Sequence, residues 1–525
     1  MPTFKLDDQV IDYQPGDTII QAAHRAGVDI PHYCWHPGLS VAANCRMCLV
    51  EIAPPPGRPA MLLDVLRYDE KKGDYVKARK PKLQPACQQP VAEGMDVKSQ
   101  TSEHVKEARA AVQEFLLLNH PVDCPICDQS GECRLQDYWL EHSGKKKRMH
   151  DEIVHKPKTV DFGPTIVYDA ERCIVCTRCV RFCEEVVKDP VLDKRERGNL
   201  GEIVLAPGRL LDHDYTLMTE YVCPVGALTA KDFRFKARVW FLRSVRSVCQ
   251  GCATGCNSFT DYDPRNQTAY RHRPRENMQV NKYWMCDSGM LDYRRIHEDR
   301  VLAARIGGST TTTEAALVAA AKALSSAESG KTALLLSALH SNEDNYALLE
   351  LGRQLGIESV FLAGKPAGKG DDILRSTDKN PNRAGVLLLL GDKAPGNIAA
   401  LAAAIDGGKV TTVLGVGSDI EDPAFASSLA KAKLIALVTH EGPVSQAAHV
   451  VLPASSWAEA EGTFVNDKGM SQVSEKAITP QGGSEPAWRW AISLAERLGK
   501  ALPFKKAKEV KAASLVQGAS SGAQA

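Results

Sequence analysis

Apolar and polar residues alternate in short runs at the start of the chain. Positions 4–6 and 10–13 alternate on either side of a polar turn, which predicts two short strands. A helical pattern over 18–26 follows, and Gly27 stands where helices commonly end. We therefore expect residues 1–100 to form a compact α+β domain.

A longer helical pattern covers residues 103–118. Val105, Ala108, Val112 and Phe115 step along it by three and four residues, so they share one face of a helix. This pattern predicts an amphipathic helix at the start of a second, mainly helical region.

The chain changes character from about residue 310. Residues 313–325 form an alanine-rich helix pattern with Glu314 near its start. Strand-length apolar runs, separated by helix-length segments, follow at 333–336, 386–390, 410–414 and 434–438. Such alternation predicts βαβ units around a parallel sheet. The last residues are rich in Ser, Gly, Ala and Gln, which predicts a disordered tail over 506–525.

Composition narrows the class of protein. A chain of 525 residues exceeds a single hydrophobic core, so several domains are expected. The net charge of +1 argues against nucleic-acid binding, and the longest apolar runs are too short to span a membrane. The N-terminus shows neither a signal-peptide nor a transit-peptide pattern. Any membrane contact is therefore expected through partner subunits.

Sixteen cysteines carry most of the candidate chemistry. All of them lie between Cys34 and Cys286. Disulfide frameworks suit small secreted domains, whereas clustered thiols in a long chain without an export signal indicate metal or redox sites. Their spacing divides them into four sets.

The first set is Cys34, Cys45, Cys48 and Cys87. A close pair of cysteines, a third on a preceding loop and a distant fourth are typical of plant-type 2Fe–2S proteins, although the first gap is longer here. A structural zinc site is the alternative. The helix-then-loop context favours a 2Fe–2S ferredoxin-like domain.

The clearest set is a run of four cysteines with a remote Cys-Pro pair, namely Cys173, Cys176, Cys179, Cys183 and Cys223-Pro224. In two-cluster ferredoxins the first three cysteines of such a run share a 4Fe–4S cluster with the distant Cys-Pro, and the fourth serves another cluster. We therefore assign one 4Fe–4S cluster to the first three cysteines together with Cys223. Cys183 is left over, because the chain has no second run of this kind.

The last set along the chain is compatible with two metals. Its members are Cys249, Cys252, Cys256 and Cys286, which suit either a 4Fe–4S cluster or a zinc ion. Neighbouring glycines would let the backbone approach an inorganic cluster, namely Gly251, Gly255 and Gly289.

One set has only three thiols, Cys124, Cys127 and Cys133. A 4Fe–4S cluster takes four ligands, so either Cys183 or His120 is the candidate for the vacancy. Fifteen cysteines and one histidine fill four sites of four ligands and leave one cysteine over, and this tally favours His120.

This ordered series resembles the large iron–sulfur subunit, the G subunit, of bacterial NADH:quinone oxidoreductase (respiratory complex I). The segment from His120 to Cys133 is the most specific part of the resemblance and implies that His120 is a cluster ligand. Residues 247–257 resemble the iron–sulfur domain of molybdopterin oxidoreductases, which implies a 4Fe–4S cluster in place of zinc. Residues 452–466 are similar to a segment found throughout molybdopterin enzymes. In complex I that domain is a relic without molybdenum, and no cysteine follows Cys286.

The resemblance implies a multidomain α+β and α/β protein. We expect a 2Fe–2S ferredoxin-like (β-grasp) domain, a helical His/Cys3 4Fe–4S domain, a ferredoxin-like 4Fe–4S domain, a molybdopterin-oxidoreductase-type 4Fe–4S domain, a relic α/β domain and a tail. Their expected boundaries are 1–100, 101–160, 161–238, 239–297, 298–505 and 506–525. The chain is also shorter than many bacterial relatives, which implies that part of the relic domain is missing.

The function implied by the resemblance is electron transfer within a proton-translocating NADH:quinone oxidoreductase. Electrons from NADH would leave FMN in a partner flavoprotein subunit and pass through one 2Fe–2S and three 4Fe–4S clusters towards quinone. The chain would lie with other peripheral-arm subunits at the cytoplasmic face of the bacterial inner membrane. It would hold no molybdenum cofactor, because no cysteine follows Cys286 to bind the metal. It would hold no flavin or NAD, because the turns at 391–396 and 415–417 lack residues that nucleotide motifs need. No complete active site is expected on this chain alone.

Two other enzymes and one non-catalytic protein are the alternatives. A subunit of an NAD-linked hydrogenase would generally end after the ferredoxin-like region, and a molybdenum formate dehydrogenase would need a Cys or selenocysteine ligand beyond residue 300. A zinc-stabilised scaffold protein is the alternative from a different class, and analysis of iron and acid-labile sulfide distinguishes it.

Overall fold

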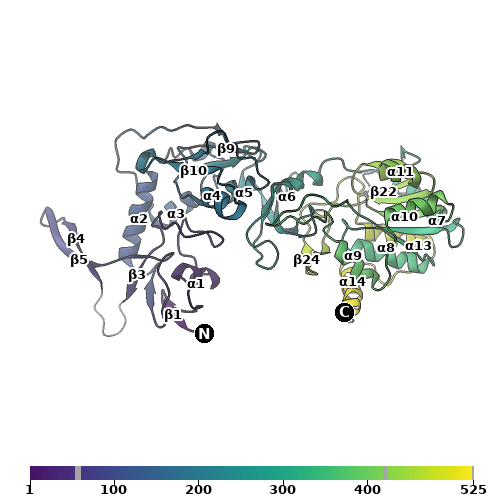
Figure 1. Ribbon diagram of the computed structural model, residues 1–525, viewed down its shortest axis with the longest axis horizontal. Coiled ribbons are helices and arrows are strands. Elements are labelled where there is room, and N and C mark those ends of the chain that lie inside the picture. Colours follow the sequence, from purple (N-terminus) through teal and green to yellow (C-terminus); the bar gives the residue numbers. More distant parts are fainter. Residues whose placement is uncertain (54–60, 418–422, 523–525) are drawn as a thin grey trace. The chain divides into compact units, whose positions relative to one another are not determined.

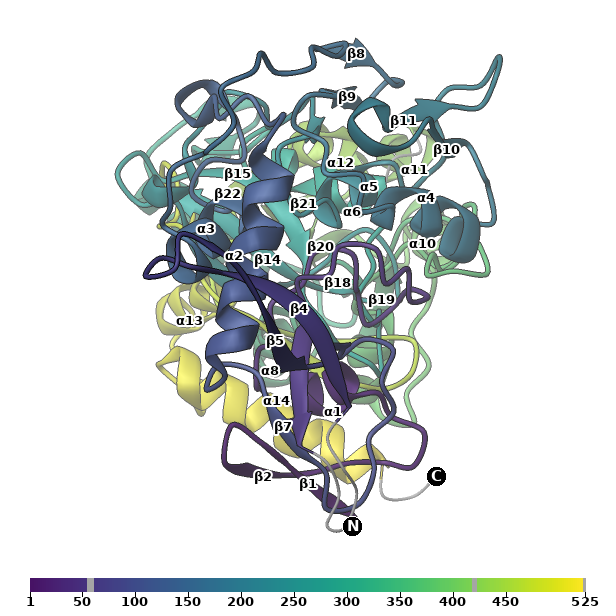
Figure 2. The same ribbon diagram turned by 90° about the vertical axis from the view of Figure 1, so that its left-hand side faces the viewer.

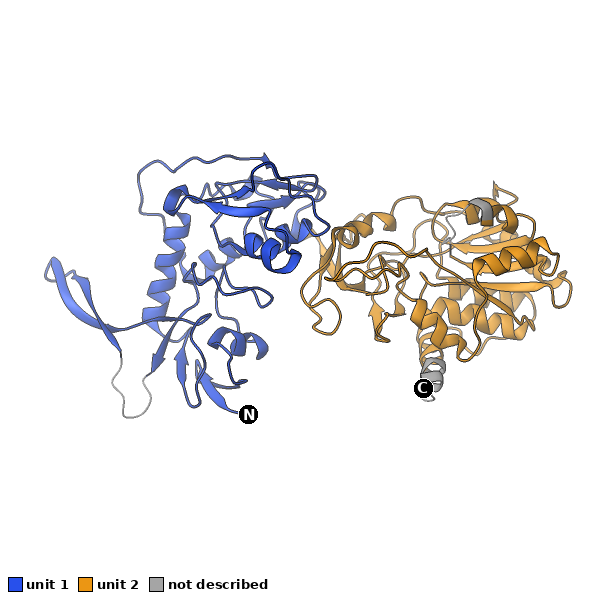
Figure 3. Cartoon of the chain, in the orientation of Figure 1, with its two compact units in different colours: residues 1–239 blue, residues 240–525 orange. Residues whose placement is uncertain are grey.

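The computed structural model describes residues 1–53, 61–417 and 423–522. The chain divides into two compact units, residues 1–239 and residues 240–525 (Figure 3). Both units combine helices with sheets, in agreement with the expected α+β and α/β class. The finer domain boundaries inside the two units stay predictions.

Unit 1 begins with a five-stranded sheet and one helix, formed by β1 (Thr3–Leu6), β2 (Gln9–Asp12), α1 (Ile19–Arg25), β3 (Leu49–Ala53), β6 (Gln84–Pro85) and β7 (Asp96–Lys98). The strand order is β2-β1-β7-β3-β6, and β1 pairs with β2 as the predicted hairpin. Gln21 accepts hydrogen bonds from the backbone N–H and the hydroxyl of Thr18, which caps α1 at its predicted start. Phe4, Leu6 and Ile20 belong to the apolar core beneath the helix.

A two-stranded hairpin, β4 (Leu62–Asp69) and β5 (Asp74–Pro81), projects from this sheet (Figure 1). Leu66 and Tyr75 are 68% and 62% exposed on it. A salt bridge of 2.5 Å between Lys80 Nζ and Glu107 Oε2 joins the hairpin to the following helix. The sequence patterns did not predict this hairpin.

That helix, α2 (Glu103–Leu117), confirms the predicted element but not its apolar face. Its buried residues are Val105, Arg109 and Gln113, whereas Phe115 is 73% exposed. Arg109 can be buried because four acceptors receive hydrogen bonds from its guanidinium. The buried face of α2 therefore includes polar side chains, although the sequence pattern predicted an apolar face.

The rest of unit 1 consists of short elements: η1 (Cys124–Ile126), α3 (Arg134–His142), β8 (Val160–Asp161), β9 (Ile166–Tyr168), α4 (Arg178–Arg181), η2 (Phe182–Val187), β10 (Leu192–Arg195), η3 (Gly198–Leu200), β11 (Glu202–Leu205), α5 (Leu217–Tyr221) and β12 (Leu228–Ala230). A three-stranded sheet has the order β12-β9-β8, and β10 pairs with β11. η2 is a π-helical turn that continues α4 directly, a local irregularity often found at functional sites.

Unit 2 starts with a small antiparallel sheet and two short helices, formed by β13 (Arg243–Val248), β14 (Asn257–Asp263), β15 (Thr268–Pro274), α6 (Asp287–Leu291) and η5 (Asp292–Ile296). A 3-10 turn, η4 (Val239–Phe241), precedes it at the boundary of the units. This small domain carries the last four cysteines.

A seven-stranded sheet follows, in the order β17-β16-β22-β21-β20-β18-β19. Its strands are β16 (Arg305–Ile306), β17 (Ser309–Thr310), β18 (Thr332–Ser337), β19 (Ser359–Ala363), β20 (Thr412–Val416), β21 (Lys433–Val438) and β22 (Val450–Pro453). The five strands from β18 to β22 pair in parallel, as the alternating pattern predicts. A separate hairpin is formed by β23 (Gly462–Val465) and β24 (Ser471–Ser474).

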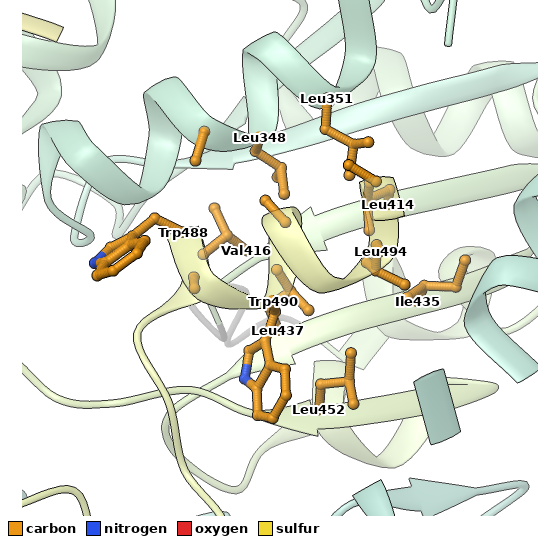
Figure 4. Close-up of a cluster of buried hydrophobic side chains, with 14 of the residues drawn as sticks. Leu348, Leu351, Leu414, Val416, Ile435, Leu437, Leu452, Trp488, Trp490 and Leu494 are labelled. Carbon is orange, nitrogen blue, oxygen red and sulfur yellow. The ribbon is translucent and has the colours of Figure 1, made fainter. Parts of the chain in front are cut away.

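Helices cover this sheet, namely α7 (Thr313–Ser325), α8 (Asn342–Gln354), α9 (Arg383–Leu390), α10 (Ile398–Asp406), α11 (Pro423–Leu429), α12 (Pro443–Ala447), α13 (Ala487–Arg497) and α14 (Ala507–Gly522). Leu414 and Ile435 from the sheet belong to one buried apolar cluster with Leu348 of α8 and Trp490 of α13 (Figure 4). This packing buries the apolar residues of the parallel strands, which explains why their runs are continuous.

Two sequence predictions are wrong in unit 2. The apolar run 386–390 lies in helix α9 and not in a strand, because a short apolar run has the same composition in a buried strand and a buried helix. The predicted tail continues as helix α14 to Gly522, which lies against α8 and α9 with Val510 fully buried (Figure 2). Residues 523–525 lie outside the described residues, as do residues 418–422 beyond the turn at 415–417.

Within the described ranges, no helix is both long and apolar enough to cross a membrane.

Candidate iron–sulfur cluster sites

The first cysteine set forms two thiol pairs in the N-terminal sheet domain. Cys34 hydrogen-bonds Cys45, and this bond lowers the pKa of Cys34 to about 5 and raises the pKa of Cys45. Cys48 hydrogen-bonds Cys87, which lowers the pKa of Cys87 and raises the pKa of Cys48. The two thiol pairs also interact electrostatically, since the negative charge on Cys34 raises the pKa of both Cys48 and Cys87. All four thiols are thus brought together, and each pair favours one thiolate, the form that binds iron.

Arg109 of α2 holds the loop between these thiols in place. Its guanidinium donates to Met47 O and Leu49 O at 3.3 Å, on either side of Cys48, and to Ser99 Oγ at 2.7 Å. Sequence analysis missed this residue. An arginine among small and apolar helix positions is the signal that could have indicated a buried partner.

The third cysteine set shares one enclosed cavity. Cys173, Cys176, Cys179 and Cys223 line one small cavity of about 10 Å³ together with apolar residues of unit 1. Burial raises the pKa of Cys173 and Cys176 to about 11 and the pKa of Cys223 to about 12. The thiols would therefore release protons on binding a metal cluster, which couples cluster binding to pH.

Cys183 lies apart from that cavity. It is fully buried on the π-helical turn η2, and its Sγ lies 3.6 Å from His213 Nε2. Burial raises the pKa of Cys183 to about 12, so this thiol is protonated and can donate to the imidazole. This contact provides Cys183 with a partner that is not a metal.

Three members of the candidate His/Cys3 set line a groove next to α3. His120, Cys124 and Cys133 line this space of about 330 Å³. Cys127 does not line the groove; it lies against Gly226, where any side-chain carbon would collide with the Cys127 Sγ. Burial lowers the pKa of His120 to about 4, so its imidazole is neutral near pH 7, the state that a metal ligand requires. Val122 N–H donates to His120 Nδ1 at 3.1 Å and holds the ring.

The last cysteine set closes around glycines in unit 2. Cys249 N–H donates to Cys256 O at 2.9 Å, and a side-chain carbon on Gly289 would lie 2.9 Å from Cys249 Sγ and 3.6 Å from Cys286 Sγ. Gly289 therefore allows the backbone to approach the thiols, as expected. Gly255 has a different role: its φ is +58°, and a side chain there would meet Gln472 and Asn466. Burial raises the pKa of Cys249, Cys256 and Cys286.

In the described ranges, no three His, Cys, Asp or Glu side chains converge tightly enough to bind a single metal ion. The assignment of ligands to four clusters stays a prediction.

A further pocket lies at the carboxyl ends of β18, β21 and β22 in unit 2. It has a volume of about 50 Å³, and His340, His440 and Trp457 line it. Open α/β sheets bind ligands at this edge. The expectation that the domain holds no molybdenum cofactor stays a prediction.

Family models match four stretches of the chain. They are a 2Fe-2S iron-sulfur cluster binding domain over 1–102, the NADH-ubiquinone oxidoreductase-G iron-sulfur binding region over 109–148, the ferredoxin-like domain of NADH-quinone oxidoreductase subunit 3 over 163–229, and molybdopterin oxidoreductase over 390–497.

Individual relatives agree with these models. The chain is 30% identical over 487 residues to the NADH-quinone oxidoreductase G subunit of Streptomyces coelicolor, covering 87% of this chain and 53% of that protein. It is 34% identical over 417 residues to the mitochondrial NADH-ubiquinone oxidoreductase 78 kDa subunit of Neurospora crassa, covering 76% of this chain and 52% of that protein. The chain thus spans about half the length of these curated relatives. A solved chain of an NAD+-reducing [NiFe]-hydrogenase is 30% identical, with a TM-score of 0.37 over 45% of this chain and 91% of that chain. From the order of its matched domains and the names of its relatives, the chain belongs to the family of the NADH-quinone oxidoreductase G subunit.

Proposed function

We propose that this chain relays electrons in an NADH:quinone oxidoreductase through one 2Fe–2S and three 4Fe–4S clusters. The ligands of the 2Fe–2S cluster would be Cys34, Cys45, Cys48 and Cys87. The three 4Fe–4S clusters would be held by His120, Cys124, Cys127 and Cys133, by Cys173, Cys176, Cys179 and Cys223, and by Cys249, Cys252, Cys256 and Cys286. The clusters, when bound, supply one-electron redox chemistry.

One observation carries this proposal. Four cysteines from two segments of unit 1 line a single buried cavity, while the neighbouring Cys183 lies outside it against His213. If these cysteines were only small core residues, no grouping of four around one cavity, with Cys183 outside it, would be expected. The separation matches the ligand rule of two-cluster ferredoxins.

The chain's own residues would bind, shield and orient the clusters. Burial of Cys34, Cys48 and Cys87 excludes water, and Arg109 fixes the loop between them. Burial keeps the imidazole of His120 neutral near pH 7. Because its unprotonated Nδ1 accepts from Val122 N–H, binding a cluster would require Nδ1 to leave this bond or the proton to move from Nε2 to Nδ1. These roles require no nucleotide or substrate site on this chain.

The partners follow from the family. A flavoprotein subunit with FMN would deliver the electrons, and other peripheral-arm subunits would pass them to quinone. The chain would lie at the cytoplasmic face of the bacterial inner membrane, in contact with the bilayer only through those subunits. It would carry no NAD, flavin or molybdenum cofactor and bind no nucleic acid.

Metal analysis tests the proposal. Purified full-length protein should contain about fourteen irons with matching acid-labile sulfide, the sum of one two-iron and three four-iron clusters. Iron near zero with stoichiometric zinc would contradict electron relay. Iron near ten with one zinc would contradict only the cluster at Cys249.

A matched pair of variants tests the ligand assignment. Cys223→Ser should remove one 4Fe–4S signal from the electron paramagnetic resonance (EPR) spectrum, because it removes a thiolate from the cavity. Cys183→Ser should keep every signal, because Cys183 already has His213 as its partner. Loss of a cluster in the Cys183 variant would overturn the assignment.

A further inference from the structure

Two buried arginines lie on α4, on either side of Cys179. Arg178 and Arg181 are only 6% and 8% exposed, and their spacing of three residues places them on the same face of the helix. Both point their guanidinium groups at backbone carbonyls outside α4.

Each arginine reaches two candidate cluster sites at once. Arg181 Nη2 donates to Cys34 O at 2.6 Å and to Cys176 O at 3.3 Å. Arg178 Nη2 donates to Trp35 O at 2.5 Å, and its Nη1 donates to Val222 O at 3.3 Å. These carbonyls belong to Cys34 and its neighbour in the 2Fe–2S set, and to Cys176 and the residue before Cys223 in the 4Fe–4S set.

Further contacts lock the same two segments together. Arg181 Nη1 also donates to Ser40 O, and Ser40 N–H donates to Glu185 Oε2 at 2.8 Å. Asn44 Nδ2 donates to Val175 O at 3.3 Å. The cysteine loop of the N-terminal domain is therefore held against the cysteine run of the ferredoxin-like region at several points.

The two guanidinium charges have no carboxylate partner among the described residues. By contrast, Arg172, which lies one residue before Cys173, forms a 2.6 Å ion pair with Asp123. Carbonyls accept from the terminal nitrogens of both arginines, and Thr177 Oγ1 accepts from Arg181 Nε at 3.4 Å, but none of these acceptors carries a net charge. Among the described residues, the buried Arg178 Nε has no hydrogen-bond partner. Arg109 is also buried against neutral acceptors, but it is a single charge with four of them. Arg178 and Arg181 bury two charges within one helical turn, and a buried charge without a counter-charge is destabilising, so this position favours a negative group.

We infer that Arg178 and Arg181 are shared counter-ions and positioning residues for the 2Fe–2S cluster at Cys34 and the 4Fe–4S cluster at Cys176. The inference rests on the proposed function. A cluster with four thiolate ligands is a net anion, so the two clusters, when bound by these cysteines, would supply the missing negative charge. Because reduction adds a further negative charge, the guanidinium groups would favour the reduced form of both clusters. The same contacts hold the two cysteine segments against each other.

Redox titration of the full-length protein, followed by EPR, tests the inference. Arg181→Gln removes the positive charge and should lower the midpoint potentials of both clusters, while the other two centres keep theirs. Arg195→Gln is the matched control, because Arg195 is exposed in the same region and paired with Glu202. It should leave all four potentials unchanged.

A conservative variant separates charge from shape. Arg181→Lys keeps the charge but not the planar fork, so its two potentials should lie closer to wild type than those of Arg181→Gln. If Arg181→Gln loses both clusters, the lysine variant should restore them. A glutamine variant with unchanged potentials, a shift at one cluster only, or a loss that lysine does not restore would overturn the inference. Wild-type protein without iron would instead contradict the proposed function.

Discussion

Unit 2 and the α4 region of unit 1 neutralise their buried charges in different ways. In unit 2, Arg300 forms an ion pair of 2.6 Å with Glu459, and both side chains are almost completely buried. In unit 1, Arg178 and Arg181 are buried against carbonyls beside two sets of cysteines. Twelve of the sixteen cysteines also lie in unit 1. The comparison indicates that the polypeptide supplies the counter-charge of Arg300 in unit 2, whereas no described carboxylate pairs with Arg178 or Arg181 in the α4 region of unit 1.

Removal of iron should have the largest effect and should act on unit 1. Without the clusters, each buried guanidinium would lack a counter-charge, which should reduce the free energy of unfolding by about 3–5 kcal/mol. Hydrogen exchange after chelation should show lost protection in β9 and α4, while β20 and β21 remain protected. Reconstitution with iron and sulfide should restore the protection. Equal protection of unit 1 with and without iron would contradict the comparison.

Breaking the buried ion pair should destabilise unit 2 without affecting the clusters of unit 1. Arg300→Met leaves Glu459 buried without its counter-charge, which should reduce the free energy of unfolding by about 3–5 kcal/mol. The double variant Arg300→Met/Glu459→Met should lose less, because no charge is left unpaired. Urea unfolding measures both losses, and EPR should show unchanged signals from the first three centres. A double variant as unstable as the sum of its two single variants would show that the pair does not act as a unit.

Acid should weaken the buried ion pairs of Asp261 with Arg271 and Arg273 in unit 2. Burial alone would raise the pKa of Asp261. The Nε atoms of Arg273 and Arg271 lie 2.6 Å and 2.7 Å from Asp261 Oδ2, and these two positive charges outweigh burial and lower the pKa to about 2. Because the folded pKa is below the unfolded value of about 3.9, the contribution is present above pH of about 4 and is lost as the pH falls towards 2. Asp261→Asn should therefore cost about 2 kcal/mol at pH 7.

The pH dependence of that cost is the measurement. Urea unfolding of wild type and Asp261→Asn, followed by hydrogen exchange in β14, should converge as the pH approaches 2. A difference between the two proteins that does not change with pH would exclude the ion-pair explanation.

The smallest expected change concerns a potential in unit 1. His120→Cys should keep the cluster and lower its midpoint potential, because a thiolate adds negative charge where the imidazole has none. His120→Ala should weaken or remove that centre and spare the others. His213→Ala is the matched control, since His213 is also a half-buried histidine next to a cysteine. If the His120→Ala protein keeps all centres at unchanged potentials, His120 is only a loop residue.

The sequence predicted the regular parts of the fold better than their surroundings. β18, β20 and β21 were visible because parallel strands buried on both faces have continuous apolar runs. The run at 386–390 had the same composition and formed helix α9, because the neighbours that decide between strand and helix are distant in the chain. The tail helix α14 was missed for the same reason, since Val510 is buried only in the folded protein.

The candidate ligands could be predicted because metal chemistry restricts both their type and their spacing. The arginines that hold the ligand segments in place could not be predicted. Arg109, Arg178 and Arg181 lie in ordinary helical patterns, and their partners are carbonyls that every residue possesses. Only the three-dimensional arrangement shows that two of these arginines connect segments about 140 residues apart.

The use of carbonyls by Arg178 and Arg181 has a consequence for how this protein can vary. Trp35, Ser40 and Val222 offer main-chain oxygens to the guanidinium groups, so replacing their side chains leaves the acceptors in place. The contact therefore depends only on the two arginine side chains and on the path of the backbone that carries the acceptor carbonyls. Substitutions in the cysteine loop should be tolerated wherever they preserve its path, whereas an insertion or deletion of one residue between Cys34 and Ser40 should move an acceptor and separate the two domains.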